Sequence, residues 1–251
     1  MLLTINTESL MNSCKNVQVG IVGYGNFGKL IEKELQKYFA LKIYDPYVKD
    51  NEKKSTSLDE LRSCDYIILS LTMDSFEKAV ESISKIVSST ATVIDVCSVK
   101  IKPLEILHKY LDGICEFIGT HPLFGPQTAQ NGIENKKIAL IPSESKKYLS
   151  VKKFLESKLK LKIIECTADE HDKEMAYVQA LSHLIGHVLT KMNLTDLPLS
   201  TATYSHILKA KDIVSNDSKA LFETIMQHNK YAKDAIETFV KSVNEIHNNK
   251  S

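Results

Sequence analysis

The sequence contains no tryptophan, and Arg62 is its only arginine. A site that binds a carboxylate through two parallel hydrogen bonds therefore has to use lysine, which acts as a point charge. No apolar run approaches the length of about 20 residues that a membrane-spanning helix needs. Residues 1–16 have neither the basic start nor the long apolar stretch of a secretory signal. We expect them to form a flexible tail.

The 251 residues carry a net charge of only +1, which excludes a general attraction to nucleic acid or to an anionic membrane. The five cysteines are scattered and form no CxxC pair, so we interpret them as reduced packing residues. With 43% hydrophobic and 25% charged residues, the composition is that of an ordinary globular protein. We predict a cytoplasmic protein whose partner is a small molecule, with no role for nucleic acid or a membrane.

Residues 23–28 read Gly-Tyr-Gly-Asn-Phe-Gly and lie between a predicted buried strand, 17–22, and a helical pattern. In this context GxGxxG indicates a dinucleotide site, with glycines for a tight turn, for approach to the pyrophosphate and for close packing of helix on strand. Asp45 ends the next predicted strand, where a carboxylate binds a ribose and repels a 2′-phosphate. An ordinary glycine-rich turn is the alternative. We predict that NAD rather than NADP contacts Gly23, Gly25, Asn26, Phe27, Gly28, Asp45, Leu71 and Ser98.

The hydrophobic pattern predicts strands alternating with helices up to residue 166, and only helices beyond it. Residues 167–170, Thr-Ala-Asp-Glu, form a capping-box sequence that starts a long helix to about residue 193. Further helices are predicted at 200–213 and 217–246. The expected architecture is an NAD-binding, doubly wound Rossmann-type α/β domain at residues 17–166. An all-helical domain at 167–251 follows, and we expect it to bind substrate and to form a homodimer.

His121 lies in the run Gly-Thr-His-Pro-Leu-Phe-Gly-Pro, residues 119–126. The prolines predict a turn after a strand at 115–118, rather than a regular helix or a central strand. A histidine with an ordinary pKa near 6.5 can act as a general base at neutral pH. A loop histidine that only satisfies backbone groups is the alternative. Ser98 follows another predicted strand, 91–95, and we expect it at the same sheet edge as the glycine loop.

Gln179, His183 and His187 are spaced four residues apart and share one face of the predicted long helix. The residues between the histidines lack the glutamate of an HExxH zinc site, so we predict no metal. We expect this polar face to contact a substrate. Partly buried, hydrogen-bonded core histidines are the alternative.

Four motifs resemble the prephenate and arogenate dehydrogenases of tyrosine biosynthesis. They are GIVGYGNFG at 20–28, DVCSVK at 95–100, THPLFGP at 120–126 and EHDKEMAYVQALSH at 170–183, with weaker similarity at 216–229. The resemblance implies oxidative decarboxylation of a cyclohexadienyl substrate without a metal. It implies that His121 takes the proton of the ring C4 hydroxyl as hydride leaves for NAD, that Ser98 bonds the same hydroxyl, and that Gln179 and His183 contact the substrate.

The chain departs from this family at one position. Bacterial prephenate-using relatives carry an arginine in the helical domain that binds the ring carboxylate, whereas this chain has Lys209, Lys211 and Asp212 in that neighbourhood. Lys211 is our candidate for the carboxylate. Asp217 falls where an acidic residue in plant-like relatives is associated with arogenate, whose ammonium a carboxylate binds. Asp212 is a second candidate for that role, and capping of the final helix is the alternative role of Asp217.

We predict an NAD-dependent prephenate dehydrogenase that makes 4-hydroxyphenylpyruvate. The first alternative is an arogenate dehydrogenase that makes tyrosine directly. More remote alternatives are a catalytically silent NAD-sensing protein of the same fold, and another small-acid dehydrogenase or imine reductase. We expect no room for a fused chorismate mutase or a regulatory domain of the usual size.

Overall fold

The computed structural model describes residues 17–48 and 55–248, so the predicted tail at 1–16 lies outside the described residues. The chain divides into two compact units. The first comprises Met1–Cys97 and Pro103–Cys166, and the second comprises Ser98–Lys102 and Thr167–Ser251. The sequence pattern does not indicate that residues 98–102 belong with the helices.

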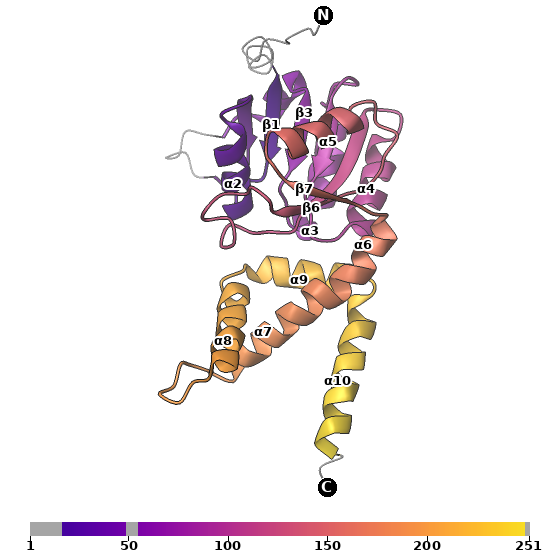
Figure 1. The fold of residues 1–251 in the computed structure, drawn as a ribbon. Helices are drawn as coiled ribbons and strands as arrows, with labels where there is room; N and C mark the ends of the chain where they lie inside the picture. Colours follow the sequence, from indigo (N-terminus) through magenta and orange to yellow (C-terminus); the bar gives the residue numbers. More distant parts are fainter. Residues whose placement is uncertain (1–16, 49–54, 249–251) are drawn as a thin grey trace, which may run out of the picture. The chain divides into compact units, whose positions relative to one another are not determined.

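A seven-stranded sheet in the order β2-β1-β3-β4-β5-β6-β7 forms the centre of the first unit. Figure 1 shows strands of this sheet with helices around them. The strands are β1 (Gln18–Val22), β2 (Ala40–Tyr44), β3 (Tyr66–Leu69), β4 (Thr92–Asp95), β5 (Glu116–Pro122), β6 (Lys137–Leu140) and β7 (Lys162–Glu165). Strands β1 to β5 run parallel, β6 is antiparallel to β5, and β7 is parallel to β6. This is the predicted Rossmann-type sheet. Strand β2 lies on one side of β1 and β3 on the other, so the strand order reverses between β1 and β3.

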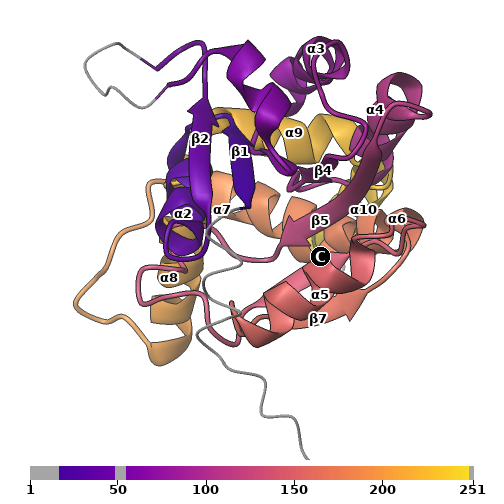
Figure 2. The same ribbon diagram turned by 90° about the horizontal axis from the view of Figure 1, so that it is seen from above.

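Helices cover both faces of the sheet, because right-handed crossovers place them on opposite faces when the strand order reverses. Figure 2 shows α3 (Met73–Ser84) and α4 (Ile101–Leu111) on one face, and α2 (Asn26–Leu35) and α5 (Tyr148–Ser157) on the other. A short 3₁₀ helix, η2 (Leu58–Ser63), precedes β3. Because both faces are covered, the central strands are runs of buried apolar residues. Ile21, Ile67, Leu69 and Val93 are all fully buried.

The face covered by α2 and α5 contains an apolar cavity of about 300 Å³. Thr120 and Pro122 of β5 contribute to its lining, together with Phe27 of α2 and Phe154 of α5. Successive side chains of a strand point to opposite faces of the sheet. The side chain of His121, between Thr120 and Pro122, therefore points to the other face, and the cavity is not the surroundings of the candidate base.

His121 lies inside β5, so the prediction of a turn at this position is wrong. The strand reaches Pro122 because hydrogen bonds from Ile141 N to Gly119 O and from Leu123 N to Lys137 O place Pro122 at a non-hydrogen-bonded position of the antiparallel pair. On its other side, β5 pairs with β4 only up to Gly119. A proline without an N–H group therefore breaks no ladder hydrogen bond here.

The second unit begins with the predicted long helix. It runs as α6 (Ala168–Met175), a π-helical segment η3 (Ala176–Leu181) and α7 (Ser182–Lys191). The predicted capping box is confirmed: Thr167 Oγ1 accepts a hydrogen bond from Glu170 N at 3.2 Å, and Thr167 N donates to Glu170 Oε2 at 2.8 Å. Helix α8 (Ala202–Ser215) packs closely on α7, and an added Cβ at Gly186 would lie 2.7 Å from Val214 Cβ.

The final predicted helix, 217–246, is wrong as a single element because it is broken at Asn229. It forms α9 (Lys219–His228) and α10 (Ala232–Asn248). Asn229 has an extended backbone, and its Oδ1 accepts a hydrogen bond from Tyr231 N at 2.9 Å. Its Nδ2 donates to Asp172 O of α6, also buried, at 2.8 Å. These side-chain hydrogen bonds replace the helical ones at the break.

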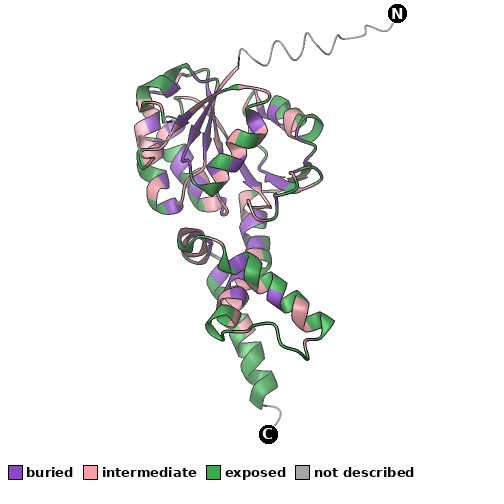
Figure 3. Ribbon diagram, turned by 90° about the vertical axis from the view of Figure 1, so that its left-hand side faces the viewer, coloured by how far each residue is buried: buried purple, intermediate pink, exposed green. Residues whose placement is uncertain are grey.

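Much of the C-terminal half of α10 is exposed (Figure 3), including Val240, Val243 and Ile246 at 48%, 47% and 65%. Within residues 17–48 and 55–248, no helix is both long enough and apolar enough to cross a membrane.

Candidate functional site

The glycine loop after β1 has the geometry that the fingerprint requires. Gly23 has a φ of +93°, and a Cβ there would lie 2.2 Å from Ser70 O. A Cβ at Gly28 would lie 2.2 Å from Gly23 O, which shows how closely α2 packs on the loop. A Cβ at Gly25 would meet nothing within 4 Å. Two of the glycines are therefore required by the fold itself, whereas Gly25 faces open space.

Asp45 lies against this loop. One carboxylate oxygen accepts a hydrogen bond from Tyr24 N at 2.7 Å, and the other accepts from Tyr47 N at 2.8 Å. Each carboxylate oxygen has a second lone pair, so both can still accept from the hydroxyls of a ribose. The hydrogen bond to Tyr24 N also holds the acidic group beside the loop that would carry the pyrophosphate.

The remaining predicted cofactor residues of the first unit are Asn26 and Phe27 at the start of α2, and Leu71 after β3. Helix α2 begins at Asn26 without a side-chain cap, so its first N–H groups can bind an anion. The Phe27 ring packs toward Phe124, with ring centroids 6.4 Å apart. Leu71 follows β3, and its carbonyl accepts a hydrogen bond from Cys97 Sγ at 3.4 Å. Together with the open space at Gly25, this loop fits a dinucleotide.

His121 lies at the same carboxyl edge of the parallel strands as the glycine loop. It is 4% exposed and stands two positions beyond Gly119, the last residue of β5 that pairs with β4. Two hydrogen bonds fix the backbone next to His121. Thr120 Oγ1 of β5 donates to Asp95 O of β4 at 2.8 Å, and Asp95 Oδ1 accepts from Cys97 N at 2.7 Å. The imidazole is thus positioned by an interior strand rather than by a loop.

In the second unit, two predicted substrate ligands carry buried polar atoms that lack hydrogen-bond partners. These atoms are Gln179 Oε1 and His183 Nδ1, and neither has a partner among residues 17–48 and 55–248. Gln179 belongs to the π-helical segment η3, and such segments occur frequently at functional sites. A buried acceptor without a partner costs about 1–3 kcal/mol, which a bound ligand can recover. This favours the predicted substrate role over core histidines that are fully satisfied.

The structure brings His183 and Asp217 together, with His183 Nε2 3.7 Å from Asp217 Oδ2. Burial and, to a smaller extent, the nearby His187 lower the pKa of His183 to about 4. Burial raises the pKa of Asp217, while His187 acts in the opposite direction. At neutral pH the His183 imidazole is therefore uncharged. A proton on Nε2, toward the carboxylate, leaves Nδ1 as an acceptor.

The alternative role of Asp217 as a helix cap is wrong. Ser218 is the N-cap of α9, and its side chain accepts a hydrogen bond from Leu221 N. His187, the third residue of the predicted polar face, packs on Phe222 with ring centroids 4.1 Å apart. The Lys211 ammonium donates to Leu194 O at 2.7 Å and lies 3.3 Å from Asp212 Oδ1. Its observed contacts are therefore separate from the His183–Asp217 pair.

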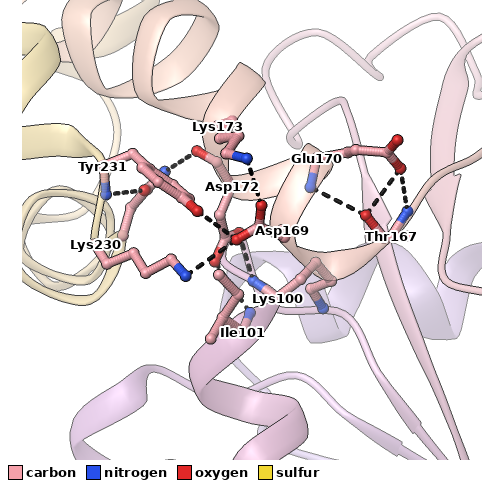
Figure 4. A network of polar contacts seen from close by, with 10 residues as sticks. Lys100, Ile101, Thr167, Asp169, Glu170, Asp172, Lys173, Lys230 and Tyr231 are labelled. Atoms are coloured by element: carbon pink, nitrogen blue, oxygen red, sulfur yellow. Dashed lines mark hydrogen bonds and ion pairs between the residues drawn. The ribbon is translucent and has the colours of Figure 1, made fainter.

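Ser98 lies in the second unit, in the segment that precedes α4. Sequence reasoning missed the residue that holds this segment, Asp172. Its carboxylate accepts hydrogen bonds from Lys100 N at 2.8 Å and Ile101 N at 3.0 Å (Figure 4). One signal was available, because α4 starts without a local Ser, Thr, Asp or Asn at its cap and so needs a distant acceptor.

A sequence model described as the nucleotide-binding domain of prephenate dehydrogenase matches residues 25–164, which is more than half of the chain. A second model, described as the C-terminal domain of TYRAAT1-like proteins, matches residues 188–249. Arogenate dehydrogenase 1 of Arabidopsis thaliana, a chloroplastic protein, is 28% identical over 246 residues. The match covers 91% of this chain but only 38% of the length of that relative.

Two examples of solved structures that share the fold are a prephenate dehydrogenase and an arogenate dehydrogenase. One is prephenate dehydrogenase from A. aeolicus in complex with hydroxyphenyl propionate and NAD+, with a TM-score of 0.74, 24% identity, and coverage of 94% of this chain and 91% of that one. The other is arogenate dehydrogenase from Synechocystis, with a TM-score of 0.68, 20% identity and coverage of 93% of both chains. At these identities the likeness concerns the fold.

Proposed function

The chain belongs to the prephenate dehydrogenase family, and on this premise we propose that it is an NAD-dependent dehydrogenase that converts prephenate to 4-hydroxyphenylpyruvate. The observation that carries the proposal is His121, which is buried at the end of β5, at the carboxyl edge of the sheet that also holds the glycine loop. Open α/β sheets bind their ligands at this edge, where the strand order reverses.

The glycine loop and Asp45 support NAD as the cofactor. The loop offers open space at Gly25 for the pyrophosphate and uncapped N–H groups at the start of α2. The Asp45 carboxylate accepts from ribose hydroxyls and repels the 2′-phosphate that distinguishes NADP. When bound, NAD accepts the hydride from ring carbon C4 of the substrate.

In the proposed reaction, His121 accepts the proton of the ring C4 hydroxyl on an imidazole nitrogen. Removing this proton allows the C4–O bond to gain double-bond character as the C4 hydride departs. The ring carboxylate leaves as carbon dioxide, and the electron pair of the broken C–C bond completes the aromatic ring. The resulting phenolate oxygen takes the proton back from His121, which gives the hydroxyl group of the product. Ser98 donates or accepts a hydrogen bond at the same oxygen. Because aromatisation drives the reaction, these groups mainly align and polarise the hydroxyl.

Arogenate is the second candidate substrate, and one observation favours it. Gln179 Oε1 and, in the tautomer with the proton on Nε2, His183 Nδ1 are buried acceptors without partners in the described structure, and the Asp217 carboxylate lies 3.7 Å from His183 Nε2. The side-chain ammonium of arogenate donates hydrogen bonds, whereas the keto group of prephenate cannot. A side-by-side assay of NADH formation from prephenate and arogenate, each with NAD and NADP, separates the candidates. Equal rates with NADP would refute the role of Asp45.

The His121→Asn variant tests the assigned base. We expect its turnover to fall by a factor of about 10² or more, since that is the usual contribution of a general base. Its dissociation constant for NAD should stay within about twofold of the wild-type value, because the imidazole does not belong to the glycine loop. His108→Asn is the matched control, since the His108 side chain is 62% exposed on α4 of the same unit. Near-normal turnover of His121→Asn would show that another group is the base.

A further inference from the structure

The start of helix α4 depends on a carboxylate that is distant in the sequence. Val99 and Lys100 are buried and precede the first helical residue, Ile101, so the N–H group of Lys100 cannot bond to water. Asp172 supplies the missing acceptors, with Oδ1 2.8 Å from Lys100 N and Oδ2 3.0 Å from Ile101 N. The carboxylate is fully buried and binds both donors at once. It therefore fixes the direction as well as the position of this peptide segment.

Asp172 is itself held from two sides. His171 Nδ1 lies 2.8 Å from Asp172 Oδ1, and both side chains are almost completely buried. The main-chain oxygen of Asp172 accepts a hydrogen bond from Asn229 Nδ2 at the break between α9 and α10. Both anchors belong to the same unit as the segment Ser98–Lys102. The helices of this unit therefore place the segment through one side chain.

We infer that Asp172 is a positioning residue for Ser98. The inference rests on the proposed function, in which Ser98 bonds the substrate hydroxyl. Lys100 N, one of the two donors that Asp172 binds, is only two residues from Ser98. Without the carboxylate, at least one buried N–H group loses its acceptor and the segment has to shift to find another. A displacement of about 1 Å at a reacting group can lower turnover by a factor of about 10².

If Asp172 only stabilised the start of α4, its loss would lower kcat by the same factor with and without Ser98. If Asp172 positions Ser98, its loss lowers kcat only when Ser98 is present, and a double-mutant cycle with Ser98 distinguishes these two roles. The variants are Asp172→Asn, Ser98→Ala and the double variant, each assayed for kcat, KM and melting temperature with the better of the two substrates. Asp169→Asn provides the matched control. Asp169 lies three residues earlier on α6, has a 43% exposed side chain, and pairs with Lys173 and Lys230 rather than with the Ser98 segment.

In the presence of Ser98, we expect Asp172→Asn to lower kcat at least about tenfold. In the Ser98→Ala background the same substitution should lower kcat less than about twofold, while the drop in melting temperature is equal in both backgrounds. Asp169→Asn should lower the melting temperature and leave kcat within about twofold. Should Asp172→Asn fail to fold, His171→Gln replaces it in the cycle, since it loosens the carboxylate while both backbone hydrogen bonds keep their acceptors.

The inference would be overturned if Asp172→Asn left kcat unchanged, or if it lowered kcat by the same factor in the wild-type and Ser98→Ala backgrounds. Either result would leave the proposed function intact. A wild-type chain that oxidises neither prephenate nor arogenate would instead refute the proposed function, and the inference with it.

Discussion

Acidification should destabilise the helical unit through His183, because this histidine is buried in its neutral form. Its pKa is lowered to about 4 by burial and by His187, against an ordinary value of 6.5. Between these two values the unfolded chain binds a proton at this position and the folded chain does not. The free energy of unfolding therefore falls as the pH is lowered through this window, and the contribution of His183 is fully present above pH 6.5.

The size of the effect follows from the two pKa values. Lowering the pH from 7.5 to 5 should remove about 2 kcal/mol from the free energy of unfolding if His183 titrates alone. Asp217, 3.7 Å away, reduces this figure, because an ionised carboxylate favours the imidazolium. Burial raises the pKa of Asp217 itself, so folding favours its protonated form and stability rises as that group takes up a proton. We expect a net loss of roughly 1–2 kcal/mol by pH 5.

Urea unfolding followed by far-UV circular dichroism between pH 4.5 and 8 measures this loss. The His183→Asn variant should have a lower stability at pH 7.5 but lack this part of the pH dependence. His206→Asn is the control, because His206 is exposed on α8 of the same unit and should leave the pH dependence unchanged. Asp217→Asn should make the dependence steeper. The reasoning would be refuted if wild type and His183→Asn lost stability in parallel as the pH is lowered.

Two glycines give contrasting predictions. Gly25→Ala should leave the melting temperature unchanged, because the added Cβ meets nothing within 4 Å. The same variant should raise the dissociation constant for NAD at least about tenfold in calorimetric titrations, since the methyl group would occupy the approach of the pyrophosphate. An unchanged affinity for NAD would contradict this placement of the pyrophosphate. Gly186→Ala should destabilise the chain by about 1–3 kcal/mol in urea unfolding, because its Cβ would lie 2.7 Å from Val214 Cβ, and Val214→Ala in the same background should restore part of the loss.

The glycine loop and the capping box at Thr167 could be predicted because each depends on residues close together in the sequence. The strand at His121 could not, because a proline is tolerated only in a particular register. That register is set by pairing with residues 137–141, whose position relative to β5 a local pattern does not contain. The break at Asn229 was missed for a similar reason, since its side chain bonds to Asp172 O, 57 residues away in the chain.

Ser98 illustrates how far the rule for open sheets extends. The rule that ligands bind beyond strand ends predicts the positions of the glycine loop and of His121. The loop follows β1, and His121 lies at the carboxyl end of β5. Ser98 also follows a strand in the chain, but its contacts assign it to the helical unit, where Asp172 holds the adjoining peptide. The helical unit thus holds one residue assigned to the chemistry, in addition to the acceptors at Gln179 and His183. A substitution in α6 that lowers turnover is therefore first to be tested for its effect on Ser98, before it is attributed to substrate binding.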